Sequence, residues 1–496
     1  MTSSPTHDRN GAEPDAGDAP ARSALPPGVV VAALCFGSLC ASLMQSLVIP
    51  IQSELPHLLG TSASNTSWVV TATLLGGAVA MPVSGRLADI VGKKPVLVVS
   101  ACILVVGSLV CALSNSIVPV VAGRVLQGLA MGFVPVAISL VREVTPPRLQ
   151  STAIATVSAT LGVGGAIGLP LAAWIAEDND WHMLFWLSAV LAALVAILVV
   201  FAVPHVRDEH PARLDVVGTV GLTVGLVAFL VGISKGSEWG WGAGSTLGCI
   251  LGGLAVLLVW GVYEIRHHDP LVELRVTARR PVLFTNIAAV LIGFGMMAQA
   301  IVVPQLLQMP EATGYGLGQS ILHAGLWMAP GGLMMMFFAP VSSRLLDTVG
   351  GRITLSVGAA VLAAGYVVAT FLTNAPWELM VASCVISAGV GIGYAAMPSL
   401  IMENVPPEEA ASGVGVNSLM RSIGTTSAGA VMAALLTSDT MTLAPGTPEI
   451  PAEGAFHLCF IVGAAAAAAG ALVALTIPRP AKRAEREADR EVVTAS

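Results

Sequence analysis

The chain has 496 residues, of which 55% are hydrophobic and only 11% are charged, and its mean hydropathy is +0.81. Because soluble domains carry about 25% charged residues, this composition excludes an ordinary soluble protein and predicts a polytopic membrane protein. The formal net charge is −7. The charges lie in loops and tails and form no basic face, which disfavours a nucleic-acid partner.

The seven cysteines fall inside or at the ends of apolar stretches, and none stands in a CxxC or Cys/His spacing typical of metal ligands. We interpret them as small packing residues and expect neither a metal nor a cofactor. The sequence also lacks a Gly-x-x-x-x-Gly-Lys phosphate-binding loop and a soluble domain of useful size. A membrane enzyme or receptor is therefore disfavoured.

Fourteen apolar runs lie between two polar tails. Residues 1–28 are rich in Pro, Gly, Asp and Ser and are predicted to be a disordered cytoplasmic tail rather than a signal peptide, and 479–496 form a charged cytoplasmic tail. Each run has roughly 18 to 25 residues, enough to cross about 30 Å of hydrocarbon as a helix. The runs are 29–51, 67–88, 95–115, 117–140, 151–176, 183–204, 216–234, 245–263, 283–306, 320–342, 353–374, 377–401, 411–436 and 455–477.

Positive charges orient these spans. Of the 23 Lys and Arg residues, all but Arg124, Arg421 and Lys235 fall in segments on one side. Arg124 and Arg421 lie within spans, and Lys235 is expected in a loop on the other side. The positive-inside rule makes the charged side cytoplasmic. We therefore expect a multi-pass protein of the cell membrane, monomeric in the lipid bilayer, with both termini in the cytoplasm.

A short polar segment recurs in the sequence. Residues 85–97 read GRLADIVGKKPVL, and 343–355 are a degenerate copy, SRLLDTVGGRITL. We call these the hinge segments. Each is expected to join two spans by a tight turn, and their aspartates, Asp89 and Asp347, are 258 residues apart. This recurrence indicates a duplicated chain.

The duplication predicts the domain organisation. Residues 29–204 form one six-helix bundle and 281–478 form another, while 205–280 are an insertion of two helices and a basic cytoplasmic loop. An even number of inserted helices keeps both bundles in the same orientation. Two parallel repeats of this kind imply a central cavity that opens alternately to each side.

The hinge segments are the expected gates. Gly85 and Gly92 lack a Cβ and so suit a tight connection. Asp89 is a carboxylate among cations, and it can pair with a nearby Arg or Lys or with the positive N-terminal end of another helix. The expected gating residues are Gly85, Arg86, Asp89, Gly92, Lys93, Lys94, Asp347 and Arg352.

The hinge segments resemble the signature loops of the major facilitator superfamily, and further motifs are similar to those of its fourteen-helix drug/proton antiporters of the EmrB/QacA type. Residues 124–128, RVLQG, are similar to the family's Arg-x-x-Gln-Gly motif, and this resemblance implies a role in proton transfer for Arg124. A guanidinium buried in a bilayer usually marks a functional pathway. The alternative is an arginine that only ties helices together.

Residues 162–174 resemble the antiporter motif that separates exporters from importers in this superfamily. The motif residues are Gly164, Gly165, Gly168 and Pro170. This copy departs from the family because Leu169 splits its Gly-Pro pair and an Ala-Ala pair replaces Gly-Gly, which leaves an importer open. Generic helix packing also accounts for the glycines. Residues 181–185 are similar to the family's Trp-Arg-x-x-Phe segment, with His182 in place of arginine.

The family's first span carries an aspartate that takes part in proton coupling, and Gln45 stands at the matching position. A pair of Gln45 and Arg124 cannot bind and release a proton, because glutamine does not titrate and arginine stays charged. The titrating group must then lie elsewhere, and His323 is expected to be the embedded candidate that titrates near neutral pH, unless it is a packing residue. The proton-coupling candidates are Arg124, Gln45, Glu54, His323 and Glu403.

Methionines, aromatic residues and amides cluster on the spans 283–306 and 320–342. Such side chains suit a pocket for several amphipathic molecules, although core or lipid-facing packing is the alternative for each. The substrate-cavity candidates are Gln45, Gln299, Met297, Trp327, Met328, Asn417 and Arg421. Two deep arginines without an obvious acid favour anionic or zwitterionic substrates.

The sequence therefore predicts an all-α polytopic membrane protein with the major facilitator fold, built from two six-helix bundles and two inserted helices. Its predicted function is secondary transport, by alternating access and coupled to protons, that exports drugs or metabolites. The alternative is an importer or symporter of a small metabolite on the same fold. We expect no enzymatic activity.

Overall fold

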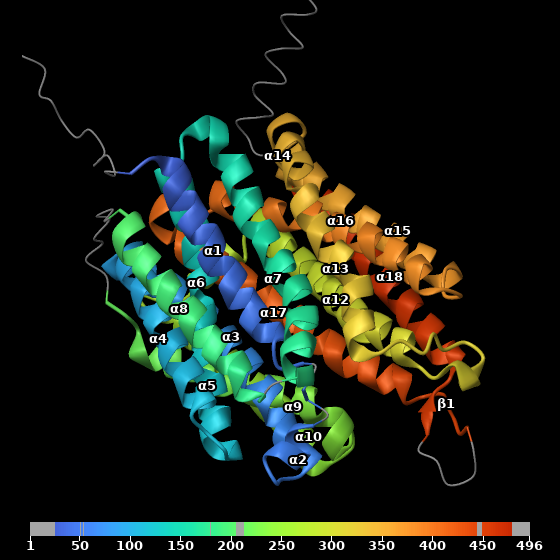
Figure 1. Cartoon of the computed structure of the whole chain (residues 1–496). Helices are drawn as coiled ribbons and strands as arrows, with labels where there is room; N and C mark the ends of the chain where they lie inside the picture. Colours follow the sequence, from blue (N-terminus) through green and yellow to red (C-terminus); the bar gives the residue numbers. More distant parts are fainter. Residues whose placement is uncertain are drawn as a thin grey trace, which may run out of the picture.

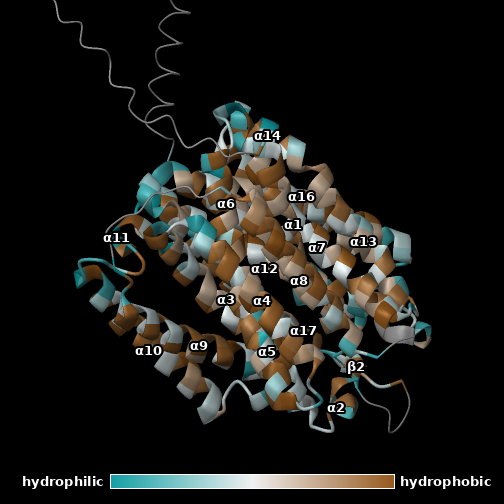
Figure 2. Ribbon diagram, turned by 60° about the vertical axis from the view of Figure 1, so that its left-hand side comes forward, coloured by the Kyte–Doolittle hydropathy of each residue, from teal (hydrophilic) through white to brown (hydrophobic). Residues whose placement is uncertain are grey.

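The structure, a computed structural model, describes residues 25–49, 51–52, 54–178, 180–204, 213–443 and 449–478. Residues 1–24 and 479–496, which hold most of the predicted tails, lie outside this part. Within it, fourteen helical segments are long and apolar enough to cross a membrane, as predicted. Figure 1 shows a bundle of long helices several helices deep, and Figure 2 shows hydrophobic residues along the middle of the helices and hydrophilic residues at their ends.

The helices form two bundles and an inserted pair. The first bundle contains α1 (Pro27–Ser46), α3 (Ala63–Val91), α4 (Lys93–Ala112), α5 (Ile117–Leu129) continued through η1 (Ala130–Gly132) into α6 (Phe133–Val144), α7 (Gln150–Asp178) and α8 (His182–Ala202). The inserted pair is α9 (Val216–Trp239) and α10 (Gly244–Arg266). The second bundle contains α12 (Arg280–Gln308), α13 (Ile321–Phe337) with α14 (Ala339–Thr348), α15 (Gly351–Phe371), α16 (Pro376–Asn404), α17 (Ala410–Leu436) and α18 (Glu453–Leu475).

Short elements connect the spans. They are α2 (Leu55–Leu58), η2 (Pro147–Leu149), α11 (Leu274–Thr277), η3 (Glu311–Thr313), η4 (Pro407–Glu409) and the antiparallel strands β1 (Thr440–Met441) and β2 (Ile450–Pro451). The described part of the chain thus has the predicted all-α architecture, with one pair of two-residue strands.

The hinge segments are more helical than the sequence predicts. The predicted span 67–88 continues to the end of α3, and the predicted span 95–115 begins earlier, at the start of α4. Hydropathy marks the part of a helix in hydrocarbon, whereas backbone hydrogen bonds carry the helix beyond it. Only Gly92 separates α3 from α4, with φ of 91°, and Gly350, with φ of 83°, begins α15. Both angles favour glycine, and the two glycines are again 258 residues apart.

The first span is shorter than predicted. We expected it to reach residue 51, but α1 ends at Ser46 and a turn follows. The reason is local, because Ile49 precedes Pro50 and the residue before a proline is disfavoured in the helical conformation. This early end leaves carbonyl groups of the last turn of α1 without intrahelical partners.

The inserted pair lies against both bundles, since α9 contacts α3 and α17. Lys235, expected in a loop, is instead buried within α9. Its ammonium is 2.9 Å from the Glu238 carboxylate, donates to the Ser64 carbonyl at 3.2 Å and lies 4.8 Å above the Trp68 ring. These contacts attach α9 firmly to α3. In contrast, only 11% of the most apolar stretch of α10 is buried, so this helix faces lipid.

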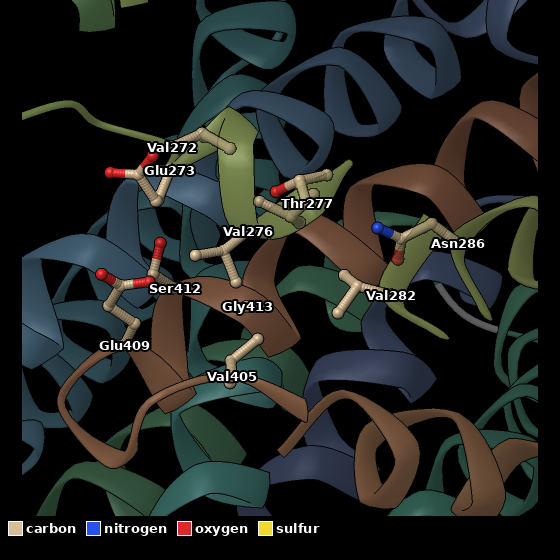
Figure 3. Close-up of a pocket in the computed structure, with 11 residues that line it drawn as sticks. Val272, Glu273, Val276, Thr277, Val282, Asn286, Val405, Glu409, Ser412 and Gly413 are labelled. Carbon is tan, nitrogen blue, oxygen red and sulfur yellow. The ribbon is translucent and has the colours of Figure 1, made fainter. Parts of the chain in front are cut away.

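A linker leads from α10 through α11 into α12, the first helix of the second bundle. Figure 3 shows α11 residues, among them Val276 and Thr277, facing Glu409, Ser412 and Gly413 at the start of α17 across a narrow crevice. The crevice has a volume of about 10 Å³, room for roughly one water molecule. The linker is therefore packed closely against α17.

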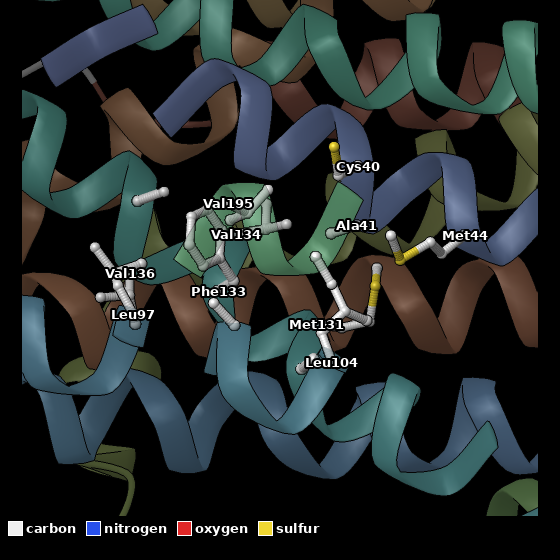
Figure 4. Packing of buried hydrophobic residues seen from close by; sticks show 14 of the residues in the cluster. Cys40, Ala41, Met44, Leu97, Leu104, Met131, Phe133, Val134, Val136 and Val195 are labelled. Carbon is white, nitrogen blue, oxygen red and sulfur yellow. The ribbon is translucent and has the colours of Figure 1, made fainter. Parts of the chain in front are cut away.

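Two apolar cores each lie mainly in one bundle, but the first also includes Ile401, Met402 and Ala411 of the second bundle, and the second includes Ala155 and Ala159 of α7. Figure 4 shows Phe133 packed among Val134, Val136 and Val195 in the first bundle, whose core also includes Leu97 of α4. In the second bundle, aromatic side chains from α15 and α18 pack together with aliphatic residues of α12 and α16. Because each core extends onto helices of the other bundle, apolar packing joins the two bundles in this conformation.

Candidate functional site

The hinge end is the end of the molecule that carries Gly92 and Gly350, and the sequence predicts it to be cytoplasmic. Here Asp89 of α3 reaches the first turn of α17 in the other bundle. Its Oδ1 accepts a hydrogen bond from Ala411 N at 3.2 Å, and its Oδ2 accepts one from Ser412 N at 2.7 Å. Asp89 is only 6% exposed. Of the partners that the sequence left open, the carboxylate thus binds a helix N-terminus, where the helix dipole favours negative charge.

Gly85 makes this contact possible. It lies within α3 and not in the connecting turn, so its role is close helix approach rather than an unusual backbone angle. A Cβ at Gly85 would collide with the carbonyl group of Ala411. Because Asp89 follows Gly85 by one helical turn, the close approach at the glycine brings the carboxylate to the N–H groups.

Cations surround this contact. The charges of Lys93 and Arg86 act on Asp89, and the buried Lys93 ammonium forms an ion pair with Glu143 of α6. Lys94 and Arg352 are partly buried, and within the described part of the chain their side chains make no hydrogen bond or ion pair. Lys93 therefore belongs to the site by a contact that the structure shows. Arg86 Nε has no hydrogen-bond partner among the described residues, so the gating roles of Arg86, Lys94 and Arg352 remain predictions.

Asp347 makes the equivalent contact in the other repeat. Its Oδ1 accepts a hydrogen bond from Ser151 Oγ at 2.6 Å, and the hydroxyl groups of Thr152 and Ser343 are 2.8 Å apart beside it. Each aspartate thus lies on the second span of its own bundle and contacts the start of the fifth span of the other. We call the two contacts the latches. The Asp347 latch is exposed and the Asp89 latch is buried, so they differ in strength.

A further hydrogen bond joins the bundles at the same end, from Arg142 Nη1 of α6 to the Met402 carbonyl of α16 at 2.7 Å. Polar contacts between the bundles therefore gather at the hinge end. In this conformation the hinge end is closed.

Arg124 occupies the middle of the first bundle and is 1% exposed. Its Nε donates to the Val69 carbonyl of α3 at 3.0 Å, and its Nη1 donates to the Met44 carbonyl of α1 at 3.2 Å and to Gln127 Oε1 at 2.7 Å. The Met44 carbonyl belongs to the last turn of α1, so Arg124 caps that helix end. Gln127 donates onward to Ser108 Oγ at 2.9 Å. Arg124 thus joins three helices.

Gln45 is next to this capped carbonyl but is not the partner of Arg124 in the hydrogen bonds described here. The expected pairing at matched depth assumed that α1 continues to residue 51. Because α1 ends at Ser46, the arginine binds the free backbone of α1 instead. Gln45 itself is half-buried.

The remaining proton-coupling candidates lie at the ends of the molecule. Glu54 is exposed and precedes α2. His323, expected to be embedded, is exposed in the first turn of α13, and its Nδ1 is 2.8 Å from Ser320 Oγ, the N-cap of that helix. Glu403 is exposed near the end of α16. His323 lies in the first turn of the candidate span that begins at Ile321. Its role in proton coupling remains a prediction.

The antiporter motif packs on two sides. On one side Gly164 and Gly168 contact α1, where added Cβ atoms would lie 2.9 Å from Ser42 Cβ and 3.1 Å from the Leu43 carbonyl oxygen. Gly165 is less crowded, with its nearest neighbour 4.0 Å away. These glycines bring helices of the first bundle together.

On its other side the same helix faces the second bundle. Gly325 of α13 lies against Pro170, because a Cβ added at this glycine would be 3.3 Å from the proline nitrogen. Gly162 leaves space for the Met335 side chain of α13. The motif therefore lies in the interface between bundles, where small residues let surfaces move past one another.

His182, in place of the family's arginine, ties α8 to the end of α4, because its Nε2 is 3.1 Å from the Ser114 carbonyl oxygen. Its backbone N–H and ring also hydrogen-bond to Asp180, which lowers the pKa of that carboxyl. This contact is structural and far from the latches.

Arg421 is the deep cation of the second bundle and is 8% exposed. Its guanidinium lies 4.7 Å from the centre of the Tyr394 ring, and Nη2 is 3.5 Å from Ser418 Oγ. Its backbone packs against Gly293 of α12. Among the described residues, no carboxylate lies within ion-pair distance of this cation. Unlike Arg124, it is held by weak contacts only.

Buried amides lie on two helices of the second bundle, α12 and α17. Asn417 donates to Asn286 Oδ1 at 2.9 Å, while the buried Asn286 Nδ2 has no partner among the described residues. Gln299 Nε2 lies 3.5 Å from the Ser383 carbonyl oxygen. The second bundle thus holds several weakly satisfied polar groups.

The remaining cavity candidates are partly buried. Trp327 Nε1 donates to Gln319 Oε1 at 3.2 Å, and Met328 packs on the core of the second bundle. Met297 is also half-buried on α12. The structure does not gather these residues around Arg421 as one pocket, so their role in binding remains a prediction.

Sequence reasoning missed the partners of the charged residues. Ser151 and Ser412 have no motif of their own, and Tyr394 resembles any apolar packing residue. One available signal was the repeat, since it implies that whatever contacts Asp89 has an equivalent near Asp347. Backbone acceptors such as the Met44 carbonyl leave no trace in the sequence.

The family model of the Major Facilitator Superfamily matches residues 34–429. The chain belongs to this superfamily. The multidrug transporter MdtP of Bacillus subtilis is 24% identical over 446 residues, which cover 87% of this chain and 79% of MdtP. A probable actinorhodin transporter of Streptomyces coelicolor is 27% identical over 427 residues, 82% of this chain and 71% of that protein.

The human organic anion transporter MFSD10 (TETRAN) has a similar fold, with a TM-score of 0.63, 15% identity, and coverage of 91% of this chain and 100% of that one. The chain spans only 62% and 52% of the length of two further MFS-type transporters that it matches. Members of the superfamily are transporters and not enzymes. The chain is therefore a multi-pass membrane protein of this superfamily. Its own transport activity and its fourteen-helix antiporter subtype remain predictions.

Replacing Arg124 by lysine should destabilise the first bundle. An ammonium is a compact point charge, and it cannot reach the acceptors that the planar guanidinium bridges. We expect a loss of about 2–4 kcal/mol, because each charged hydrogen bond contributes about 1.5–3 kcal/mol. The measurement is the Tm of the purified protein in detergent. The exposed Arg344→Lys is the matched control, and an unchanged Tm for Arg124→Lys would contradict the capping role.

Proposed function

We propose that this chain is a secondary transporter that exports amphipathic drugs or metabolites across the cell membrane in exchange for protons. The observation that carries the proposal is the pair of reciprocal latches, in which each bundle closes on the other at the hinge end. Membership of the Major Facilitator Superfamily and the similarity to MdtP and to a probable actinorhodin transporter support it. The positive charges on the hinge side support a cytoplasmic hinge end.

The latches have a strength suited to switching. The two bonds of Asp89 to backbone N–H groups contribute about 1.5–3 kcal/mol each. A shift from 1:99 to 99:1 between two states requires about 5.5 kcal/mol. Substrate binding or protonation can therefore tip the balance between a closed and an open hinge end without disrupting either bundle.

Arg421 supports a preference for substrates with an anionic or zwitterionic group. A buried charge without a counterion is costly, and Arg421 has no acidic partner among the described residues. The carboxylate, sulfonate or phenolate of a substrate would supply the counterion. The Tyr394 ring beside the guanidinium would contact the apolar part of such a molecule.

An importer remains the second candidate, because the motif around Pro170 departs from the antiporter pattern at Leu169. Inside-out vesicles with an acidic interior distinguish the two. An exporter accumulates substrate in these vesicles, and a protonophore abolishes the accumulation. Substrate depletion from preloaded vesicles would support the importer, and accumulation that persists with the protonophore would exclude proton coupling.

Asp89→Asn should abolish dye or antibiotic extrusion while the protein remains in the membrane. The substitution removes the charge that the N–H groups of Ala411 and Ser412 bind, so the hinge end closes less often. Asp347→Asn should have a smaller effect, because that latch is exposed. Efflux rates from loaded cells, normalised to protein in the membrane fraction, give the comparison. Extrusion by Asp89→Asn at the parental rate would refute the latch.

Arg421→Gln should weaken transport of anionic substrates selectively. Loss of the counterion for a bound anion is expected to raise KM for anionic substrates about tenfold, which corresponds to 1.4 kcal/mol. Transport of cationic dyes should be unchanged or improved. Competition between matched anionic and cationic compounds in vesicles provides the readout, and an equal loss for both classes would argue that Arg421 is structural.

A further inference from the structure

At the hinge end of the inserted pair, two buried carboxyl groups lie beside the same glycine, Gly218. Asp215 is the N-cap of α9 and is 7% exposed, and its Oδ1 accepts hydrogen bonds from Gly218 N at 2.8 Å and from Tyr263 Oη at 3.2 Å. Glu264 lies in the last turn of α10 and is 1% exposed, and its Oε1 accepts a hydrogen bond from Val272 N at 2.7 Å. One oxygen of each group is therefore satisfied.

The second oxygen of each group has no hydrogen-bond partner in the part of the chain that the structure describes. These atoms, Asp215 Oδ2 and Glu264 Oε2, are both buried, and both lie against Gly218, where an added Cβ would meet the two of them. Two adjacent carboxylates in a buried site cannot both be ionised without a large cost. A single proton between these oxygens would satisfy both at once.

Other titratable groups near the pair do not replace this proton. His267 Nε2 is 4.0 Å from Asp215 Oδ2, beyond hydrogen-bond distance, and its side chain is 38% exposed. Tyr263 already donates to Asp215 Oδ1 and stacks on His267. Where α3 and α17 pack against this region, they present the apolar side chains of Val83 and Val416.

We propose that Asp215 and Glu264 form a proton-binding site in which one shared proton keeps the linker docked on α17, so that release of this proton loosens the closed hinge end. Only its link to gating rests on the proposed function, namely that the hinge end opens during transport. The ligand is a proton exchanged with the solution at the hinge end.

The linker connects the acid pair to the buried latch. Glu264 holds Val272 through its backbone N–H, and the buried Leu271 and Val272 pack with Leu222 of α9 and Val416 of α17. Across the crevice, the linker faces Ser412, whose N–H binds Asp89 (Figure 3). The same turn of α17 therefore contacts both the linker and the latch.

The direction of the effect follows from charge. With one proton bound, the pair carries a single negative charge, and Glu264 remains in place to accept the bond from Val272. When the proton leaves, the two carboxylates repel, Glu264 moves toward solvent, and the linker loses its anchor. Docking of the linker is therefore present at lower pH and is lost as the pH at the hinge end rises.

Hydrogen–deuterium exchange of the purified full-length protein tests this inference. The amides of the linker around Val272 and of the first turns of α17 should lose protection by about tenfold or more as the pH rises from mildly acidic to mildly alkaline, after correction for intrinsic exchange. In Glu264→Gln, protection should persist at alkaline pH, because the amide oxygen still accepts the bond from Val272 and carries no charge. Asp215→Asn provides a second test if Glu264→Gln folds poorly.

Two controls locate the titration. Asp269→Asn removes an acid from the same linker outside the pair, and His267→Gln removes the nearby base, and both should keep the parental transition. Absence of a transition in the parent, its persistence in Glu264→Gln, or its loss in His267→Gln would overturn the proposal. The measurement needs no substrate or gradient. Its result can therefore contradict the proton-binding site without contradicting proton-coupled export, and the reverse also holds.

Discussion

The closed conformation depends on one contact between the bundles. In this contact, a carboxylate of one bundle accepts hydrogen bonds from the first-turn N–H groups of a helix in the other bundle. Asp89 can reach Ala411 and Ser412 only because Gly85 lets α3 approach α17 closely, and α4 can begin immediately afterwards only because Gly92 adopts a positive φ. The hinge segment therefore combines a tight connection between two helices of one bundle with a hydrogen-bonded contact to the other bundle. In the second repeat Ser343 stands in place of Gly85, and the exposed Asp347 binds the Ser151 hydroxyl instead of backbone N–H groups.

The two deep arginines have different kinds of contacts. Arg124 satisfies backbone carbonyls of α1 and α3 and so holds the first bundle together, although the family resemblance implies a role in proton transfer. Arg421 has an aromatic ring and a distant hydroxyl as its neighbours. Under the proposed function, one cation would serve as a structural cap and the other would be available for a bound anion.

The sequence predicts the spans, the repeat and the hinge residues because hydropathy and recurrence are local signals. It does not predict that Arg124 binds the end of α1. The acceptor there is the Met44 backbone carbonyl, and any residue type at that position would carry one. It also missed Asp215 and Glu264, which are far apart in sequence and look like ordinary charges of a polar loop. Only the packing of α9 on α10 brings them together.

The attachment of α9 limits how the bundles can swing. Polar contacts of Lys235 fix this helix on α3, whereas its contact with α17 consists of aliphatic side chains such as Leu226, Leu230 and Leu419. Aliphatic contacts involve no directional bonds, so these contacts predict that α9 would move together with the first bundle if the two bundles tilt against each other. The inserted pair would then set a limit on the range of that tilt.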